Sequence, residues 1–443
     1  MADVAVVGAG WAGLSAALRA IEAGHRCTLY EAATVPGGRA RRVPWDDADG
    51  TVTAIDNGQH ILLGAYRETL ALCGLAGVDP ARVLQRHPLH LEGNGVRMVA
   101  ANLPAPLHLA AAIIGAQGLT WGERLAMLRL MTHLRRAGWR LAPDRSVAAL
   151  LAEQAQPAGL CRRIWEPLCL AALNTNAATA SAQVFVHVLR DSLGGGRHAS
   201  DLLLPAADLS ALLPDAALAR VRAHGAVHTG TRVTALAPDA QSVTLTCGTG
   251  ETARPVRHEA VVLATPPWIT ARLLAPLPAA MGLAACCAAL EYEPIATVWL
   301  RFAVAAGASA LLSFPMLALA DDPARGHYGQ WAFDRMRLCG QEGLLAVVIS
   351  GDGAHRALDA ATLAAAVRAQ VRDQLGLAAP LIAHRVIVEK RATFRATPEL
   401  VRPAVRTPWP RLMLAGDYCA SDYPATLESA VKSGREAVAA LGL

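Results

Sequence analysis

The chain has 443 residues, 53% of them hydrophobic, so it is long enough to form two or three ordinary domains. Its net charge of +5 is small and dispersed along the chain, and we therefore expect no nucleic-acid partner. Nine cysteines without a pairing pattern, and no Cys-x-x-Cys pair or His/Cys cluster, predict reduced thiols and no metal site.

The N-terminal segment up to Glu31 predicts a strand, a glycine turn, a helix and a second strand. The strands are the apolar runs 4–7 and 27–30, and the helix is the alanine- and leucine-rich stretch that ends near Ala23. The turn before the helix contains Gly8, Gly10, Trp11, Ala12 and Gly13.

This order of elements is typical of a Rossmann-type dinucleotide site. Gly8 permits the tight turn, Gly10 lets the backbone approach a pyrophosphate, and Gly13 lets helix and strand pack closely. The unpaired N–H groups at the helix N-terminus are expected to bind the phosphates. Glu31 ends the second strand, where it is placed to accept hydrogen bonds from the ribose hydroxyls. The combination favours dinucleotide binding over a glycine turn in some other α/β unit.

Two later segments indicate that the dinucleotide is FAD. Gly38 and Arg39 follow Glu31 closely. In a flavoprotein, a second backbone segment and a positively charged side chain contact the FAD pyrophosphate at this point. The segment 55–60 is interpreted as a strand end and a turn near the isoalloxazine. This turn is expected to bring three residues to the flavin: Gly58, Gln59 and His60.

A third cofactor-binding segment lies near the C-terminus. The run 412–415 predicts a strand that ends in Gly416 and Asp417, and the segment 424–434 predicts a helix with small residues at its start. Asp417 is expected to hydrogen-bond ribityl or pyrophosphate-linked oxygens. The first N–H groups of the helix are expected to stabilise negative charge at flavin N1 and O2. These groups belong to the turn from Leu427 to Ala430.

The motifs at both ends of the chain resemble the FAD-dependent amine oxidase and phytoene desaturase superfamily. The resemblance implies an α/β fold in which a Rossmann-type FAD-binding domain is interleaved with a mixed α+β substrate domain. It also implies that the backbone of Val233 holds the adenine. The superfamily helix usually has glycine where this chain has Ser429, and a serine still permits close approach. Covalent members attach the flavin to a cysteine before the position of Gly416, where this chain has none, so we expect non-covalent FAD.

The implied domains alternate along the chain. The FAD-binding domain is expected in three parts, residues 1–75, 201–275 and 386–443. Residues 76–200 are expected to form a helical region that faces substrate and membrane, and residues 276–385 the sheet of the substrate domain.

Four segments in the middle of the chain are specific to a subfamily, whereas the flavin motifs are shared by the superfamily. These segments are 165–175, 292–298, 330–335 and 389–394. They resemble the hydroxysqualene dehydroxylase family of bacterial hopanoid synthesis. The resemblance implies reductive conversion of hydroxysqualene to squalene, with flavin hydride passing to an allylic cation, and a functional link to squalene-synthase-like enzymes. The chain has no second complete dinucleotide motif, so the reductant is either transiently bound NAD(P)H or a separate reductase.

Loss of a hydroxyl group at neutral pH requires a general acid, a role that suits a histidine or a carboxylic acid with a raised pKa. His60 is our candidate because it follows the turn at Asp56 and Gly58 that is expected beside the flavin. The alternative is that His60 only hydrogen-bonds the cofactor or the backbone. Weaker candidates for the acid are Asp334, Arg335 and Tyr292.

Three other functions stay open at this point. A phytoene-type desaturase shares the fold and cofactor but works oxidatively. An amine oxidase needs an aromatic cage at the flavin, for which Tyr418 and Tyr423 are candidates in a chain with only 5% aromatic residues. The third is a flavin-bound membrane scaffold without enzymatic activity.

A long isoprenoid substrate gains on the order of 20 kcal/mol in lipid over water, so we expect the enzyme to draw it from the membrane. The chain has neither an apolar run of the ~20 residues that span a bilayer nor a basic signal-peptide segment. We therefore expect a cytoplasmic protein bound peripherally to the inner face of the cell membrane. The segment 120–141, after the apolar 107–119, predicts a helix that either binds anionic lipid or presents a solvated face. Its basic stripe consists of Arg129, His133, Arg136 and Arg140.

Overall fold

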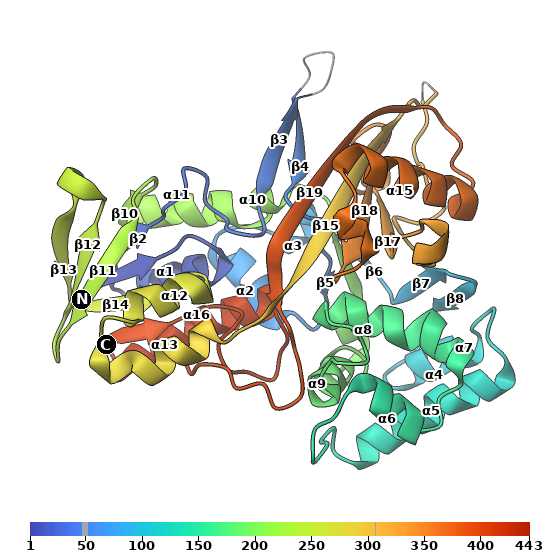
Figure 1. Ribbon diagram of the computed structural model, residues 1–443, viewed down its shortest axis with the longest axis horizontal. Coiled ribbons are helices and arrows are strands. Elements are labelled where there is room, and N and C mark those ends of the chain that lie inside the picture. Colours follow the sequence, from blue (N-terminus) through green and yellow to red (C-terminus); the bar gives the residue numbers. More distant parts are fainter. Residues whose placement is uncertain (47–51, 306) are drawn as a thin grey trace.

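The computed structural model describes residues 1–46, 52–305 and 307–443. Figure 1 shows three parts: a sheet with helices that holds both chain termini, a second large sheet, and a group of helices beside that second sheet. Each of the two sheets takes strands from distant parts of the chain. The interleaved α/β architecture that the sequence predicts is therefore confirmed.

The first sheet is assembled from three separate stretches of the chain. Its five strands are all parallel and lie in the order β10-β2-β1-β14-β20. Residues of β14 are buried throughout, as expected for a parallel strand that is covered on both faces. The strands are β1 (Asp3–Val7), β2 (Arg26–Tyr30), β10 (Gly225–His228), β14 (Ala260–Leu263) and β20 (Leu412–Leu414).

Alternating residues of β1 enter two different cores on the two faces of this sheet. Val4 and Val6 pack against a layer of three helices, whereas Ala5 and Val7 face an antiparallel strand group and two further helices. The first layer consists of α1 (Trp11–Glu22), α11 (Pro214–His224) and α16 (Leu427–Leu441). The second consists of β11 (Val233–Pro238), β12 (Val243–Cys247), β13 (Arg254–His258), α12 (Pro267–Leu274) and α13 (Met281–Ala288).

The second sheet has seven strands in the order β19-β15-β18-β17-β16-β7-β8. Alternate residues of β15 pack against α15 (Ala360–Leu375) on one face, and the other face turns toward the interior of the molecule. The strands are β7 (His90–Gly93), β8 (Val96–Val99), β15 (Tyr292–Phe302), β16 (Met316–Ala318), β17 (Trp331–Asp334), β18 (Leu344–Ser350) and β19 (Leu381–Phe394). The short helix α14 (Arg335–Cys339) follows β17.

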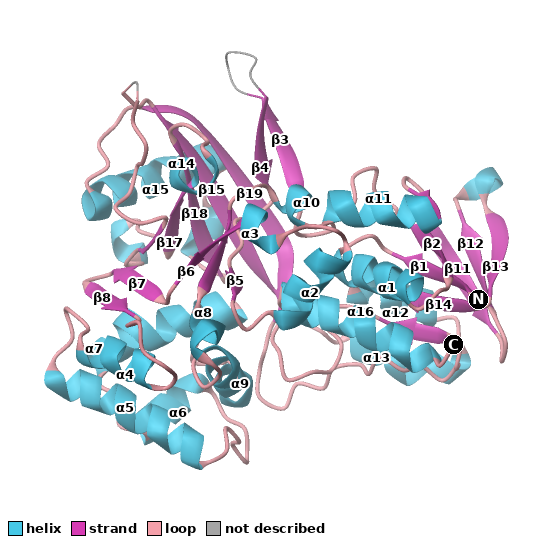
Figure 2. Ribbon diagram, turned by 180° about the vertical axis from the view of Figure 1, so that it is seen from behind, coloured by secondary structure: helices cyan, strands magenta, loops and turns pink. Residues whose placement is uncertain are grey.

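Short strands and helices connect the two sheets, and Figure 2 shows them between the two ends of the molecule. They are β3 (Arg42–Asp46), β4 (Val52–Asp56), β5 (Leu62–Leu63), β6 (Leu84–His87), β9 (Leu202–Pro205), α2 (Arg67–Leu75), α3 (Pro80–Val83) and α10 (Leu209–Leu212). The helical group consists of α4 (Leu107–Ile114), α5 (Trp121–Arg136), α6 (Val147–Glu153), α7 (Ala158–Leu160), a π-helical turn (Cys161–Trp165), α8 (Glu166–Leu173) and α9 (Ala182–Ser192).

The helix expected over 120–141 is shorter than predicted. Thr120 and Glu123 form a capping box at its start, so α5 begins where the sequence indicates. It ends at Arg136, because Gly138 and Trp139 have positive φ angles of 63° and 60°, which no α-helix accommodates. The prediction that Arg140 extends the basic stripe of this helix is therefore wrong.

Two further features concern the expected segments and the membrane. β19 runs without interruption across the expected boundary at residue 386, and the region 76–200 contains strands β6 to β8 besides its helices. Within the part of the chain that the structure describes, none of the helices combines the length and apolar character that a bilayer crossing requires.

Candidate active site

One large cavity, of about 1060 Å³, runs from the glycine turn of the first sheet to the helical group. The residues predicted to contact FAD line this cavity, with the exception of Gly13, and His60 lines it too. Gly13 has a packing role instead, because a Cβ atom there would lie 1.8 Å from the carbonyl oxygen of Gly8. The structure thus brings together residues from three distant segments of the sequence.

The backbone segments around the glycine turn pack too closely to accommodate side chains. Gly8 has a φ of 107°, and a Cβ there would lie 2.5 Å from the carbonyl oxygen of Ala264. Gly38 lies directly opposite Gly10, since a Cβ on Gly38 would be 3.1 Å from the Cα of Gly10. The two backbone passes therefore form a narrow cradle without side chains, as a pyrophosphate requires.

The N-terminus of α1 opens into this cradle. Gly10 is its N-cap residue, and no side chain caps the helix, so its first N–H groups are available to an anion. The side chain of Trp11 turns away into the core, where its Nε1 donates to the carbonyl oxygen of Ala40 at 3.0 Å. These features fit the diphosphate of FAD.

Glu31 lies at the end of β2 and hydrogen-bonds to two backbone segments of the cradle. One carboxylate oxygen accepts from the backbone N–H of Ala9 at 2.7 Å, and the other from the N–H of Ala33 at 2.8 Å. Each oxygen retains a second lone pair for a ribose hydroxyl. Val233, which the superfamily resemblance implies as the adenine contact, lies at the start of β11 and is buried in the adjoining cavity wall.

Arg39 and Asp417 meet across the cavity from opposite ends of the sequence. An Arg39 guanidinium nitrogen lies 2.6 Å from an Asp417 carboxylate oxygen, and another donates to the carbonyl of Ala392 at 2.5 Å. The pair fixes both side chains where the ribityl and pyrophosphate oxygens are expected.

The N-terminus of α16 is the second helix end that opens into the cavity. Thr426 and Ser429 form its capping box: Thr426 Oγ1 accepts from the N–H of Ser429 at 3.1 Å, and Ser429 Oγ accepts from the N–H of Thr426 at 3.0 Å. Ser429, the departure from the superfamily pattern, thus stabilises the helix start and leaves the cavity free. Glu428 is buried on the other side, where it accepts from the first N–H groups of α2.

His60 lies in the cavity wall with a defined tautomer. Its Nδ1 is 2.7 Å from the carbonyl oxygen of Gly58, and because a carbonyl only accepts, Nδ1 carries the proton. Burial lowers the pKa of His60, so the ring is neutral at pH 7 and Nε2 has a free lone pair. A proton donated from Nε2 must therefore first be taken up there.

A buried ion pair supports the turn that carries His60. An Arg335 guanidinium nitrogen lies 3.7 Å from an Asp56 carboxylate oxygen and donates to Gln59 Oε1 at 3.3 Å; Gln59 Nε2 in turn donates to the carbonyl of His60 at 3.1 Å. Burial raises the pKa of Asp56 to about 6, although the charge of Arg335 acts in the opposite direction. Asp56 is therefore ionised at pH 7 and balances the buried arginine.

The weaker acid candidates lie outside the cavity wall in the described structure. Arg335 acts beneath the turn, and Asp334 accepts from the backbone N–H groups of Met336 and Arg337 at the start of α14. Tyr292 packs edge-on against Trp268, and burial raises its pKa to about 12. None of the three therefore reaches the cavity as His60 does.

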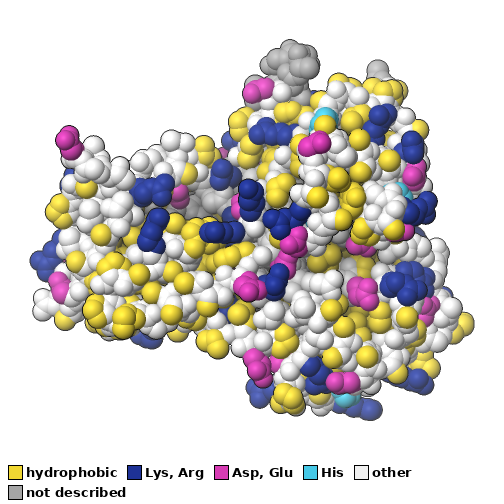
Figure 3. Space-filling view, viewed as in Figure 1, with side chains coloured by type: hydrophobic (Ala, Val, Ile, Leu, Met, Phe, Trp, Pro, Cys, Tyr) yellow, Lys and Arg dark blue, Asp and Glu magenta, His cyan; other side chains and the backbone are white. Residues whose placement is uncertain are grey.

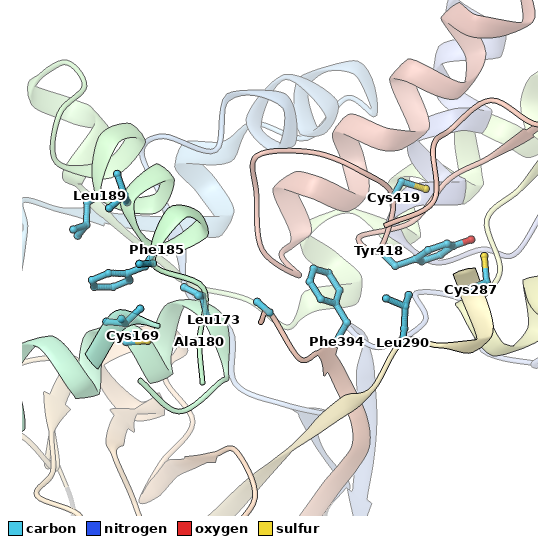
Figure 4. Close-up of a cluster of buried hydrophobic side chains, with 14 of the residues drawn as sticks. Cys169, Leu173, Ala180, Phe185, Leu189, Cys287, Leu290, Phe394, Tyr418 and Cys419 are labelled. Atoms are coloured by element: carbon cyan, nitrogen blue, oxygen red, sulfur yellow. The ribbon is translucent and has the colours of Figure 1, made fainter. Parts of the chain in front are cut away.

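The two tyrosines considered for an aromatic cage both line the cavity. The hydroxyl of Tyr418 is held by Thr270 Oγ1 at 3.0 Å, and its ring packs against Gly416. The Tyr423 ring lies 5.5 Å from the ammonium of Lys432. Figure 4 shows Tyr418 within a buried cluster with Leu290 and Phe394, so its ring is part of the core.

The part of the cavity beyond His60 is mainly apolar, and it lies between the two regions that the sequence assigns to the substrate, 76–200 and 276–385, although the individual wall residues were not predicted. Three faces contribute: the inner sides of α4 and α5, the helices α8 and α9, and the interior face of the second sheet. The only local sequence signal for a residue of this wall is the helical spacing of the apolar residues on α5. The main apolar residues are Leu109, Ile113, Met127, Leu128, Met131, Leu168, Leu189, Trp331 and Phe333.

Three of the four subfamily-specific segments, 165–175, 292–298 and 389–394, meet at one junction of the fold. Asn174, which ends α8 with a φ of 50°, donates to the carbonyl of Pro294 at 3.2 Å and to Thr393 Oγ1 at 2.9 Å. Its Oδ1 accepts from the N–H of Gly351 at 2.7 Å. The segments thus join the helical group to the second sheet around the cavity.

Comparisons with known proteins agree with this geometry. The family model of flavin containing amine oxidoreductases matches residues 11–442, and the chain belongs to this family. It is accordingly an FAD-dependent oxidoreductase, as the sequence motifs predict.

Within that family, the chain is similar over its full length to hydroxysqualene dehydroxylases. It is 32% identical to that of Rhodopseudomonas palustris and 27% identical to that of Sinorhizobium fredii, in each case over 98% of this chain and 97% of the relative. A 15-cis-phytoene desaturase of Synechococcus elongatus is 34% identical, but over only 28% of this chain and 26% of the relative. The resemblance stated from the sequence is confirmed.

Solved structures share the fold at low sequence identity. An oxidoreductase from Methanosarcina mazei superposes with a TM-score of 0.71 at 14% identity, covering 98% of this chain and 99% of that chain. A putrescine oxidase bound to putrescine gives a TM-score of 0.70 at 17% identity, covering 99% of this chain and 98% of that chain.

Proposed function

We propose that the protein reductively dehydroxylates hydroxysqualene, or an equally long allylic isoprenoid alcohol, to the hydrocarbon. The observation that carries the proposal is the continuity of the cavity, which joins the FAD cradle to a long apolar chamber. The similarity to hydroxysqualene dehydroxylases over the full chain supports the same substrate.

The residues of the chain have separate tasks in this reaction. FAD, when bound and reduced, supplies a hydride. The apolar walls from α4, α5, α8 and α9 hold the hydrocarbon and exclude water, so that a cation formed on the substrate is not captured by solvent. His60 takes up a proton at Nε2 and passes it to the leaving hydroxyl group, while Gly58 holds Nδ1. The Asp56–Arg335 pair fixes the turn and thereby the imidazole.

The test is a single turnover without air. Enzyme whose FAD has been reduced chemically is mixed with hydroxysqualene, and the flavin absorbance is followed together with the product. We expect one squalene for each flavin that becomes oxidised, and no oxidation with squalene itself. Oxidation that is indifferent to hydroxysqualene contradicts the proposal. Repeating the assay with reduced enzyme regenerated by NAD(P)H, or by a reductase from the same cells, identifies the electron donor.

The oxidative alternatives predict the opposite electron flow and are tested with oxidised FAD in place of reduced FAD. A phytoene-type desaturase would reduce oxidised FAD with phytoene, and an amine oxidase would do so with an amine panel. The partial match to phytoene desaturases and the buried, hydrogen-bonded Tyr418 favour neither. A non-enzymatic scaffold would leave the flavin unchanged with every compound. A functional link to squalene-synthase-like enzymes belongs to the same proposal, because such enzymes handle the same carbon skeleton.

A further inference from the structure

Exposed apolar side chains gather at one corner of the molecule, formed by α4, the N-terminal half of α5 and the loop before α4. Trp121 and Leu107 are 69% and 56% exposed, although large apolar residues are usually buried. Figure 1 shows this corner at the end of the helical group, far from both chain termini. We call it the α4–α5 corner, defined by Leu103, Leu107, Ile114, Trp121 and Leu125.

Four of these side chains, Leu107, Ile114, Trp121 and Leu125, lie on adjoining exposed faces of the two helices. Leu107 and Ile114 are two turns apart on the same side of α4. Arg124 connects the two helices, because its guanidinium donates to the carbonyl of Ile114 at 2.5 Å and lies 4.6 Å from the ring centre of Trp121. Leu125 follows Trp121 by one turn on the exposed face of α5.

One part of the α4–α5 corner has no charged residues, and the part that follows it is basic. The stretch 98–122 contains no Asp, Glu, Lys or Arg, whereas α5 then contributes four arginines and one acid. That acid, Glu123, is buried and bound by Arg163 at 2.5 Å. The exposed face of α5 thus begins with Trp121 and Leu125 and continues with Arg129 and Arg136. Hydrophobic and basic side chains lie together at this corner in the space-filling view (Figure 3).

The inner faces of the same two helices line the cavity. Leu109 and Ile113 of α4, and Met127 and Met131 of α5, contribute to its apolar wall. Pro106, at the start of α4, is both exposed and part of the cavity lining, so the cavity reaches the surface beside Leu107. A single pair of helices therefore separates the interior chamber from the apolar surface patch.

We propose that the α4–α5 corner docks on a bilayer with anionic headgroups and is the port through which the apolar substrate enters. The apolar loop and helix fit the acyl region, Trp121 fits the interface, and the arginines fit the headgroup charge. The uncharged stretch 98–122 is followed on α5 by the exposed Arg129 and Arg136, and this combination of an apolar surface with basic residues matches an anionic bilayer. The port function rests on the proposed isoprenoid reaction, whereas docking itself does not.

Binding to vesicles tests the docking step without any substrate. The holoenzyme is sedimented with vesicles of phosphatidylcholine alone or with phosphatidylglycerol added. We expect binding to the anionic vesicles that weakens at high salt. Leu107→Glu/Trp121→Glu should reduce the partition coefficient at least about tenfold, because two apolar anchors are replaced by charges. The matched control is Ile382→Glu/Val401→Glu, which changes two equally exposed apolar residues elsewhere and should bind like the parent.

The arginines are tested separately. Arg129→Gln/Arg136→Gln should lower binding to anionic vesicles about fivefold for each arginine and leave binding to neutral vesicles unchanged. Docking is refuted if the parent binds neither type of vesicle, or if the Leu107/Trp121 variant binds like the parent. Dimers of the parent that this variant disrupts, without vesicle binding, would identify the corner as a self-association surface instead.

The port is tested by supplying the substrate in two forms. Hydroxysqualene in anionic vesicles should be converted at least about tenfold more slowly by the Leu107/Trp121 variant, whereas hydroxysqualene in detergent should be converted at the parent rate. Equal loss in both forms refutes the port. An enzyme that docks through this corner but converts no hydroxysqualene in either form contradicts the proposed function and leaves docking intact.

Discussion

Glu31 shows how one side chain serves both the fold and the cofactor. Its two carboxylate oxygens hold the N–H groups of Ala9 and Ala33, on either side of the cradle. Removal of the carboxylate therefore loosens the turn as well as deleting a ribose acceptor. We expect a larger loss in the free energy of FAD binding than in the free energy of unfolding, because no other acid in the turn can replace Glu31 at the ribose.

We predict that Glu31→Ala weakens FAD binding by about 1.5–3 kcal/mol, the scale of a hydrogen bond to a charged group. The dissociation constant is measured by titrating apoprotein with FAD and following flavin fluorescence. Glu22→Ala, which removes an exposed acid at the end of α1, is the control and should bind FAD normally. Unchanged affinity in Glu31→Ala would mean that Glu31 is not the ribose ligand.

His60 gives the pH dependence of the reaction a definite sign. Burial lowers the pKa of its imidazole below the ordinary value of 6.5, so the acid form is scarce at pH 7 and increases as the pH falls. We predict that kcat for dehydroxylation rises as the pH is lowered toward this pKa and levels off below it. The pH profile of single-turnover rates at saturating hydroxysqualene measures this.

His60→Ala should abolish that pH dependence and slow the step by roughly 10²–10⁴, the usual contribution of general acid catalysis, while FAD stays bound. His90→Ala is the control: His90 also lines the cavity but is bound to Glu92 at 2.7 Å, and its variant should keep the pH dependence. A normal rate in His60→Ala would exclude the acid role and leave only hydrogen bonding to the cofactor or backbone.

The Asp56–Arg335 pair is buried without access to solvent, so its two members depend on each other. We predict that Asp56→Ala lowers the free energy of unfolding by about 3–5 kcal/mol, because it leaves a buried arginine without a counter-charge. Asp56→Asn/Arg335→Met removes both charges and should recover much of that loss. Urea denaturation at saturating FAD gives both values, and equal stability of the two variants would contradict the charge argument.

At the scale of elements, the cofactor side was predictable because its signals are local. Gly8, Gly10 and Gly13 lie within six residues of one strand–helix unit, and an added Cβ at Gly8 or Gly13 would clash with backbone atoms. The start of α5 was predictable for the same reason, from Thr120 and Glu123. Its end at Arg136 differs from the prediction although Gly138 is a typical helix terminator, because the spacing of the basic residues continues to Arg140.

On the substrate side the sequence indicates the contributing regions, 76–200 and 276–385, but not the individual wall residues, because the wall is made by pairs of elements that are distant in sequence. Met131 on α5 and Phe333 on β17 look like ordinary core residues in isolation, and only the fold places them around a cavity. The position of Arg335 was likewise not evident from the sequence, because a buried arginine beneath a turn cannot be distinguished by sequence from one at a reacting group. Only its distance to Asp56 and Gln59 shows the difference.

The contact between α1 and α16 gives a prediction at the same scale. A Cβ on Gly434 would lie 2.3 Å from the carbonyl oxygen of Ala12, so Gly434→Ala must push α16 away from the FAD cradle. We expect a loss of about 1–3 kcal/mol in the free energy of unfolding and weaker FAD binding. Gly282→Ala in α13, where the added methyl meets open space, should instead stabilise the protein by about 0.5–1 kcal/mol. Similar unfolding midpoints for both variants would contradict this packing argument.

For the whole molecule, the cofactor joins parts that the chain order separates. The cradle takes residues 8–39 from the first sheet's N-terminal unit and residues 416–430 from its C-terminal unit, so bound FAD links the two ends of the chain. A ligand that binds only the folded state stabilises it by about 2.7 kcal/mol at a concentration one hundred times its dissociation constant. The thermal midpoint of the apoprotein should therefore rise with added FAD.

The same assembly predicts that FAD is held without a covalent bond. Among the described residues that line the cavity there is no cysteine, and Cys419, which follows Tyr418, is buried away from it. The purified protein should be yellow, and acid precipitation should release all of the flavin into the supernatant, because denaturation separates the two ends of the chain that hold it. Absorbance of the supernatant and the redissolved pellet measures the partition. Flavin that stays with the pellet after denaturation would show a covalent link and overturn the prediction.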